Sequence, residues 1–173
     1  MPACELLLER IALPAPIGQV LIVSDGRQLL GLEFDEPEKR LLRLLQTRFR
    51  GRFTLHDTTD LKQLSDPIRA YFAGDLHALD AVPVDAGGTP FQQRVWAALR
   101  HIPVGSTRTY GQLAAMIGSP AAARAVGLAN ALNPISLAIP CHRVIGSSGA
   151  LTGYGGGIER KRWLLDHERQ ACA

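Results

Sequence analysis

Apolar positions in the first 34 residues alternate with polar ones or form short apolar runs, a pattern typical of β-strands. We predict strands at residues 6–13, 17–24 and 29–34. Pro14-Ala15-Pro16 separates the first two runs, and Ser24-Asp25-Gly26 is a turn signal before the third. These strands are expected to form a small antiparallel sheet.

The remainder of the first half predicts two helices and a further strand. Asp35 is a candidate cap for a helix that begins near Pro37. That helix would direct four leucines toward the sheet: Leu41, Leu42, Leu44 and Leu45. A second helix is expected to follow Asp66-Pro67 and to stop at Gly74, before a strand-like run at 81–85.

Helix signals become stronger in the second half of the chain. Thr89-Pro90-Phe91-Gln92 is a capping box with proline at the first helical position, and it predicts a helix that extends to about Arg100. A second capping box, Thr109-Tyr110-Gly111-Gln112, predicts a short helix that stops at Gly118.

A third helix is expected directly after the second one. Ser119-Pro120 predicts its cap and start, residues 121–131 form its body, and Asn133-Pro134 ends it. Two short helices joined through a single glycine are typical of a helix-turn-helix, in which the second helix is the recognition helix.

These elements together predict an α+β fold of two domains, with a boundary at Gly87-Gly88. Residues 1–86 would form an N-terminal domain with the small antiparallel sheet and its helices. Residues 87–173 would form a mostly helical C-terminal domain that contains the helix-turn-helix and a cysteine loop.

Composition narrows the class of protein. Hydrophobic residues make up 46% of the 173 residues, which suffices for a sizeable core, and the net charge is +3. A mildly positive charge permits nucleic-acid binding without requiring it. No apolar run approaches the roughly 18–20 residues of a membrane span, and no secretory signal is visible. We therefore expect a cytoplasmic protein without a membrane partner.

Basic residues gather in the predicted first helix and just after it. A DNA-facing patch and a solvated helix face both explain such a cluster, and we favour the solvated face. The residues concerned are Lys39, Arg40, Arg43, Arg48, Arg50 and Arg52.

The three cysteines are Cys4, Cys141 and Cys172. Their odd number and wide spacing match neither a disulfide framework nor a CxxC metal site, and the histidines are scattered. We therefore expect no metal and no cofactor.

Cys141 and His142 place a thiol beside an imidazole. A thiol is a useful nucleophile only as the thiolate, so a reactive cysteine needs a basic or positive neighbour. Adjacent residues of an extended strand point to opposite faces, so this pair cooperates only if the chain turns, which Pro140 favours. Taken alone, the dipeptide fits a buried structural cysteine better, because such cysteines behave as small hydrophobes.

The surroundings favour a reactive cysteine. Five segments, read in order between Thr89 and Glu168, resemble the O6-alkylguanine-DNA alkyltransferases, also called methylated-DNA–protein-cysteine methyltransferases. The segments are Tyr110-Gly111-Gln112-Leu113-Ala114, Ala123-Arg124-Ala125-Val126-Gly127, Asn133-Pro134, Pro140-Cys141-His142-Arg143-Val144 and Gly153-Tyr154. The first eighty or so residues carry no motif of this family, and the zinc ligands of some members have no counterpart here.

The resemblance implies the roles of the candidate catalytic residues. Cys141 would be the nucleophile, with His142 as its base through a water and Glu168 orienting the imidazole. Without the resemblance, nothing favours Glu168 over Asp166. Tyr110 would donate a proton to guanine, and Asn133 would hold the turn before the active-site segment. We interpret Arg143 as a structural residue that supports the loop.

The resemblance also implies how DNA is bound. The recognition helix is poor in the polar side chains that read bases in a major groove, and Arg124 is its only long side chain. In the family this helix enters the minor groove, and the matching arginine takes the place of a flipped nucleotide. Ser119 would hold a phosphate on backbone amides, although capping alone also explains it. Tyr110 and Ser147 complete the expected DNA contacts.

A glycine-rich loop at 146–157 is expected to form the rim of the substrate pocket. Tyr154 would flank the inserted base, and the backbone of Val144 would accept hydrogen bonds from guanine. Two positions depart from the family pattern. Gly155 stands where some members have a hydroxyl, and Leu132 stands where a glycine often precedes the asparagine.

The expected function is irreversible transfer of an alkyl group from O6-alkylguanine in double-stranded DNA to Cys141, with O4-alkylthymine as a further substrate. A thioether has no good leaving group, so each monomer would act once, alone or cooperatively along the duplex. Two alternatives stay open: a helix-turn-helix DNA-binding protein without chemistry, and a Cys/His hydrolase.

Overall fold

The computed structural model describes residues 2–35 and 38–172 of the chain. Four strands form one sheet in the order β3-β2-β1-β4. Their bounds are β1 Cys4–Ala12, β2 Gln19–Ser24, β3 Leu29–Phe34 and β4 Phe53–Asp57. The three predicted strands are present, and β2 pairs antiparallel with both of its neighbours.

The fourth strand makes the sheet mixed rather than wholly antiparallel, because β4 runs parallel to β1. The sequence did not predict β4. This edge strand has only five residues, and its two apolar side chains, Phe53 and Leu55, are partly buried. So short a run carries little periodicity, and pairing with β1 decides its conformation.

Helix α1 (Glu38–Phe49) packs on one face of the sheet. Leu41 and Leu45 are buried there among strand residues, whereas Leu42 and Leu44 are only partly buried. Two of the four leucines expected to face the sheet are therefore fully buried against it. The predicted start of this helix at Pro37 lies outside the described residues.

Helix α2 (Lys62–Phe72) begins earlier than predicted, and Pro67 lies inside it. A proline within a helix removes one backbone donor, which normally ends or kinks the helix. Leu64, Ile68 and Tyr71 recur at helical spacing and are buried, so packing against the core outweighs that cost. The strand-like run at 81–85 is also not a strand, since only Val84 forms a single bridge to β3.

Within residues 87–172 the α-helices are α3 Pro90–Arg100, α4 Tyr110–Met116, α5 Ala123–Ala131 and α6 Ile158–Ala171. Both predicted capping boxes are present, at Thr89 and at Thr109. The predicted cap at Ser119 is wrong: α5 begins at Ala123, and the Ser119 carbonyl accepts the N–H of Ala122 in a turn before it.

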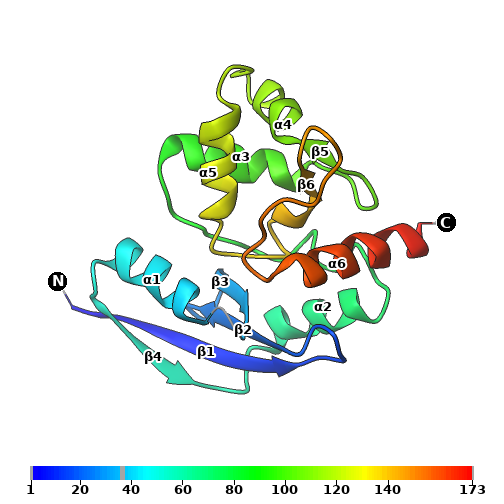
Figure 1. Ribbon diagram of the computed structural model, residues 1–173. Coiled ribbons are helices and arrows are strands. Elements are labelled where there is room, and N and C mark those ends of the chain that lie inside the picture. Colours follow the sequence, from blue (N-terminus) through cyan, green and yellow to red (C-terminus); the bar gives the residue numbers. More distant parts are fainter. Residues whose placement is uncertain (1, 36–37, 173) are drawn as a thin grey trace.

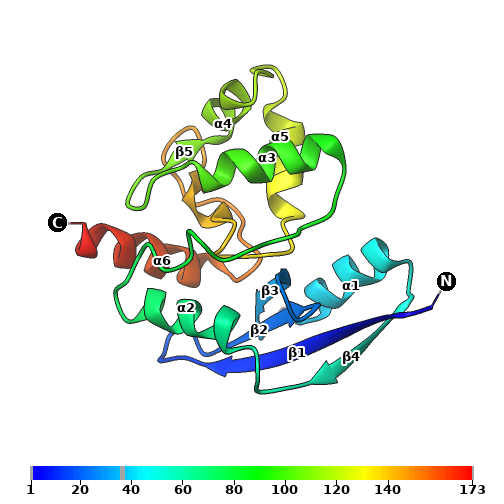
Figure 2. The ribbon, with the colours of Figure 1, turned by 180° about the vertical axis from the view of Figure 1, so that it is seen from behind.

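The two halves of the chain pack on each other around one hydrophobic core. Figures 1 and 2 show the sheet at the bottom with α1 and α2 above it, the helices α3 to α5 at the top, and α6 lying along α2. Phe34 and Tyr71 from the first half share the core with Val95 and Leu164 from the second. The α+β fold class is confirmed. No helix of residues 2–35 and 38–172 is long and apolar enough to cross a membrane.

The connection between the halves is sterically demanding at Gly88. Its φ is +82°, and a Cβ built there would lie 2.6 Å from the Trp96 ring. Gly118 is a matched control, because its φ is +75° but a Cβ would meet no atom within 4 Å.

We predict that Gly118→Ala costs about 1 kcal/mol of unfolding free energy, the strain of a left-handed alanine. Gly88→Ala adds a clash with a buried ring and should cost a further 1–3 kcal/mol or so. Urea denaturation of both variants measures the difference. Equal losses would contradict the predicted clash at Gly88.

Candidate active site

The chain turns at Cys141, as Pro140 predicted. Cys141–Arg143 form a 3₁₀ turn, η1, in which the N–H of Arg143 donates to the Pro140 carbonyl at 3.1 Å. Successive residues of such a turn project about 120° apart, so the three side chains point in different directions. Strand β6 (Val144–Ile145) then pairs with β5 (Arg108–Thr109) and joins the end of η1 to the start of α4.

His142 is fully buried and binds the carboxylate that the sequence proposed. Its Nε2 lies 2.7 Å from Glu168 Oε1, while its Nδ1 is buried and has no hydrogen-bond partner among the described residues. Asp166, the alternative carboxylate, is exposed and lies beside Arg169. The fold therefore selects Glu168 over Asp166.

Arg143 has a more specific role than the loop support expected of it. Its Nε donates to Glu168 Oε2 at 3.0 Å, and its Nη2 donates to Oε1 at 2.9 Å. The remaining Nη1 donates to the Ile102 carbonyl at 2.7 Å. Arg143 therefore supplies the counter-charge of Glu168, a fork-shaped pairing that guanidinium geometry favours.

Electrostatics keep the reacting pair neutral at rest. Burial would raise the pKa of Glu168, but the hydrogen bonds from His142 and Arg143, together with the charge of Arg143, hold that pKa well below its usual range. Burial lowers the pKa of His142 and outweighs the opposing effect of Glu168. Burial also raises the pKa of the Cys141 thiol, and the hydrogen bond from Asn133 opposes this shift.

Asn133 makes the backbone hydrogen bonds expected of it. Its Nδ2 donates to the Ile139 carbonyl at 2.8 Å, and its Oδ1 accepts the N–H of Ile135 at 3.0 Å. The side chain is fully buried. It thus ties the end of α5 to the segment that carries Cys141.

Cys141 lines a pocket of about 380 Å³. Tyr110, Tyr154 and Gly155 line it too. Val144, the other residue expected in the substrate pocket, is fully buried and is not among the lining residues. Tyr110 and Thr152 Oγ1 are hydrogen-bonded at 2.9 Å, which joins α4 to the rim loop. The buried Oδ1 of Asn130, also a pocket residue, has no partner among the described residues, so a ligand that supplies a donor is favoured there.

Sequence reasoning missed Arg40, which reaches the same pocket from α1. It forms an ion pair with the buried Glu33 and donates to the carbonyls of Ala131 and Asn133. Its guanidinium also occupies the space beside Gly155, where a Cβ would lie 3.2 Å away. Part of the basic cluster is therefore paired rather than solvated. The one feature of the sequence that could have indicated this pairing is Glu33, a charged residue within an apolar strand.

Lys161 was also missed. It is buried, and its Nζ donates to the carbonyls of Val144 at 2.6 Å and Thr152 at 3.0 Å. Lys161 therefore holds the rim loop against the strand after η1. It already occupies one lone pair of the Val144 carbonyl expected to bind guanine.

Two family profiles match the chain, one in each half. Residues 90–170 match the family profile described as 6-O-methylguanine DNA methyltransferase, DNA binding domain, and residues 11–86 match its ribonuclease-like domain. The chain belongs to the 6-O-methylguanine DNA methyltransferase family. The ribonuclease-like match covers the part of the chain in which sequence reasoning found no family motif.

Relatives resemble the chain over nearly its whole length. The methylated-DNA–protein-cysteine methyltransferase of Shigella flexneri is 48% identical over 166 residues, 95% of this chain and 96% of that protein. The protein of the same name from Mycobacterium bovis is 50% identical over 90% of this chain and 88% of its own. The crystal structure of Mycobacterium tuberculosis OGT in complex with DNA superposes with a TM-score of 0.77, at 44% identity, over 95% of this chain and 94% of that one.

The predicted DNA-contacting residues of this family member lie at the surface. Arg124 is exposed on α5, one turn before Leu128, whose side chain is 63% exposed. Ser147 is exposed on the rim loop, and Ser119 is partly buried in the turn before α5. The opposite end of α5, at Asn130 and Ala131, lines the Cys141 pocket, so one short helix connects the exposed face to the reacting group.

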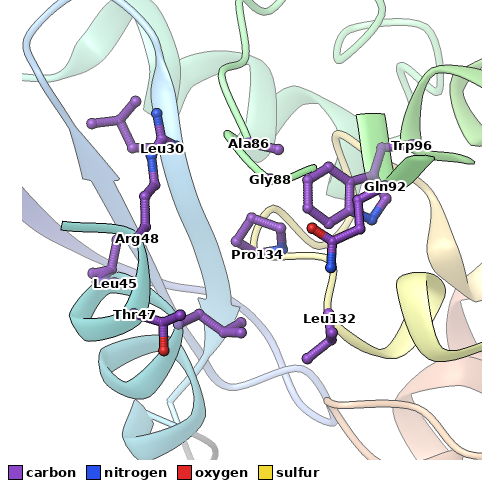
Figure 3. A pocket seen from close by; sticks show the side chains of 11 residues that line it. Leu30, Leu45, Thr47, Arg48, Ala86, Gly88, Gln92, Trp96, Leu132 and Pro134 are labelled. Atoms are coloured by element: carbon purple, nitrogen blue, oxygen red, sulfur yellow. The ribbon is translucent and has the colours of Figure 1, made fainter. Parts of the chain in front are cut away.

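Leu132, which departs from the family pattern, lines a second pocket of about 280 Å³ between the two halves. Figure 3 shows it with Arg48 of α1 and with Trp96 of α3. The bulk that replaces glycine therefore lies beside the contact between the halves, and Leu132 is not among the residues that line the Cys141 pocket.

The buried Glu168–Arg143 pair generates a stability prediction. Glu168→Gln leaves a buried arginine without its counter-charge, and should cost about 3–5 kcal/mol of unfolding free energy at neutral pH. Asp166→Asn, on the same helix but exposed, should change it by no more than about 0.5 kcal/mol.

The same pair predicts how stability depends on pH. Because folding lowers the pKa of Glu168, its contribution is complete above the unfolded value of about 4.3 and is lost as the pH falls below it. Urea denaturation should therefore show a steeper acid loss for the native chain and Asp166→Asn than for Glu168→Gln. Parallel curves for all three would contradict the assignment.

Proposed function

We propose that the protein repairs DNA by moving the alkyl group of O6-alkylguanine to Sγ of Cys141, once per molecule, with O4-alkylthymine as a further substrate. The observation that carries this proposal is the arrangement of Cys141 in a pocket beside a His142–Glu168 pair. The named activity of the Shigella flexneri and Mycobacterium bovis relatives supports it. So does the DNA bound by the Mycobacterium tuberculosis protein.

The hydrogen bond to Glu168 supports an assignment of the basic nitrogen of His142. A neutral imidazole has one N–H and one lone pair, and an ionised carboxylate can only accept. The N–H is therefore on Nε2, and the lone pair is on Nδ1. We assign Nδ1 as the base that takes the Cys141 proton, directly or through one water.

Alkyl transfer then proceeds as a displacement at carbon. Sulfur bonds to the alkyl carbon, the carbon–oxygen bond breaks, and its electron pair passes to guanine. Tyr110, which lines the pocket, donates a proton to guanine and regains one from solvent. Cys141 loses one proton, through His142, and guanine gains one proton, through Tyr110. The reaction therefore balances without a cofactor or an oxidant.

Neutral resting groups suit a protein that reacts once. Because burial raises the pKa of Cys141, the thiol is protected from oxidation until a substrate enters. Asn133 and Lys161 both favour the thiolate, the first by a hydrogen bond and the second by its charge. The product thioether has no route back to the thiol, which makes the transfer irreversible.

DNA binding is assigned to the exposed face of α5. A helix of small residues fits closely into the minor groove, and Arg124 would replace the nucleotide that swings into the pocket. Ser119, Ser147 and Tyr110 would contact the backbone beside it. Tyr154 would flank the base, and the free lone pair of the Val144 carbonyl would accept from guanine.

Two coarser expectations also stand as proposals. We divide the chain into domains of residues 1–86 and 87–173 at Gly87-Gly88, where both glycines have positive φ. A cytoplasmic monomer remains a prediction, and light scattering coupled to size-exclusion chromatography tests the oligomeric state.

Intact mass spectrometry tests the alkyl transfer. After mixing with duplex DNA that carries one O6-methylguanine, the native chain should gain the mass of one methylene, stoichiometrically, and Cys141→Ser should gain none. An unchanged mass with an intact lesion would favour a DNA-binding protein without chemistry. Repeated turnover of an ester would favour a hydrolase.

Nucleotide flipping predicts a substrate-dependent effect of Arg124→Ala. Transfer from duplex DNA should slow about tenfold or more, because the extruded state loses the side chain that replaces the base. Transfer from the free base O6-benzylguanine needs no flipping and should stay within about twofold. Arg162→Ala, which removes an exposed arginine from α6, is the control for lost charge. Equal slowing on both substrates would refute the role in flipping.

A further inference from the structure

Tyr71 brings the first half of the chain to the reacting group. It lies on α2, is almost completely buried, and donates its hydroxyl to Glu168 Oε1 at 2.8 Å. That oxygen is the one bound to Nε2 of His142. Nothing in the mechanism above requires this tyrosine, and no motif of the sequence pointed to it.

The position of Tyr71 is fixed from several sides. Its carbonyl accepts from Nε2 of His167 at 2.8 Å, and its ring meets those of Phe72 and His167 edge-on at 5.2 and 5.4 Å. His167 neighbours Glu168 on α6, and Figures 1 and 2 show α6 lying along α2. The packing of α2 against α6 therefore holds the Tyr71 side chain in place, with its hydroxyl at the Glu168 carboxylate.

The tyrosine can act only as a donor. Burial and the charge of Glu168 raise the pKa of Tyr71 far above its usual range, so the phenol keeps its proton. Oε1 of Glu168 thus accepts from three groups, namely Tyr71, His142 and Nη2 of Arg143. When several donors share one carboxylate oxygen, each hydrogen bond to that oxygen is weaker. The hydrogen bond from Tyr71 therefore weakens the interaction of Glu168 with His142.

We propose that Tyr71 is a positioning residue for alkyl transfer, which holds Glu168 Oε1 at the correct place and moderates its bond to His142. The proposal rests on the proposed function, in which His142 is the base. It makes the N-terminal domain, which carries no reacting group, a determinant of the reaction rate.

The direction of the pH effect follows from the groups around the pair. His142 faces Glu168, and both Arg143 of η1 and Lys161 of α6 lower the pKa of His142 by their charge. The loop at Gly105 contributes only a backbone N–H, 3.5 Å from Glu168 Oε2. Without the tyrosine hydroxyl, Glu168 Oε1 stabilises the protonated imidazole of His142 more strongly, so the pKa of His142 should rise.

The test compares Tyr71→Phe with His167→Phe. The first variant keeps the ring and loses the bond to Glu168. The second keeps an aromatic ring against Trp163 and loses only the bond to the Tyr71 carbonyl. Both remove one hydrogen bond between α2 and α6, so their midpoints in urea should fall similarly.

Single-turnover rates of alkyl transfer should separate them. For Tyr71→Phe we expect a plateau rate about tenfold lower, the effect of one hydrogen bond to a charged group. The acidic limb of its pH–rate profile should move to higher pH, because His142 with a raised pKa becomes neutral only at a higher pH. His167→Phe keeps an aromatic ring beside Tyr71 and leaves the Tyr71 hydroxyl on Glu168, so its rate should stay within about twofold of the native rate and its pH dependence should not move. Equal rates and limbs for the two variants would overturn the proposal.

NMR titration of the His142 ring distinguishes failure of this proposal from failure of the proposed function. If the native chain transfers no alkyl group, alkyl-transfer repair is wrong, and the titration still tests the tyrosine. An upward shift of the His142 pKa in Tyr71→Phe, absent in His167→Phe, supports the positioning role. An unchanged His142 pKa in Tyr71→Phe overturns it.

Discussion

The buried carboxylate of Glu168 is the group on which the active site depends. An isolated carboxylate at this depth would be protonated, because leaving water costs it far more than the fold could supply. Arg143 neutralises its charge, and the hydroxyl of Tyr71 and the imidazole of His142 complete its hydrogen bonds. The same interactions set the tautomer of His142 and direct its Nδ1 away from the carboxylate. Stability and reactivity thus share one set of contacts.

The N-terminal half supports the reaction centre from two directions. Tyr71 approaches Glu168 from α2, and Arg40 approaches the pocket from α1. Arg40 also binds the carbonyl of Asn133, whose side chain holds the segment before Cys141. Since one core joins both halves, the placement of η1 depends on packing across the entire chain. This explains how the half of the chain in which sequence reasoning found no family motif participates in the site.

Burial gives the reacting cysteine a resting state that differs from that of many cysteine enzymes. Burial raises the pKa of the Cys141 thiol and lowers the pKa of the His142 imidazole, so it favours the neutral form of both groups. An irreversible, single transfer benefits from such a state, since a thiolate held ready would also react with oxidants. In the proposed function, DNA recognition falls to an exposed helix, α5, whose far end lines the pocket. Substrate binding and chemistry would then be coupled through one short helix.

Local order was determined by the sequence alone. Three strands follow from their runs of apolar residues, the capping boxes at Thr89 and Thr109 follow from contacts three residues apart, and the turn at Cys141 follows from Pro140. Apart from the family resemblance, only the tertiary structure favoured Glu168 over Asp166. The tertiary structure alone placed Arg143 and Tyr71 on Glu168, started α2 before Pro67 and added β4 to the sheet. Local features depend on neighbours within about one helical turn, and such spacing is legible in a sequence. Tyr71 and Glu168 lie 97 residues apart, and no periodicity records which distant side chains packing will bring together.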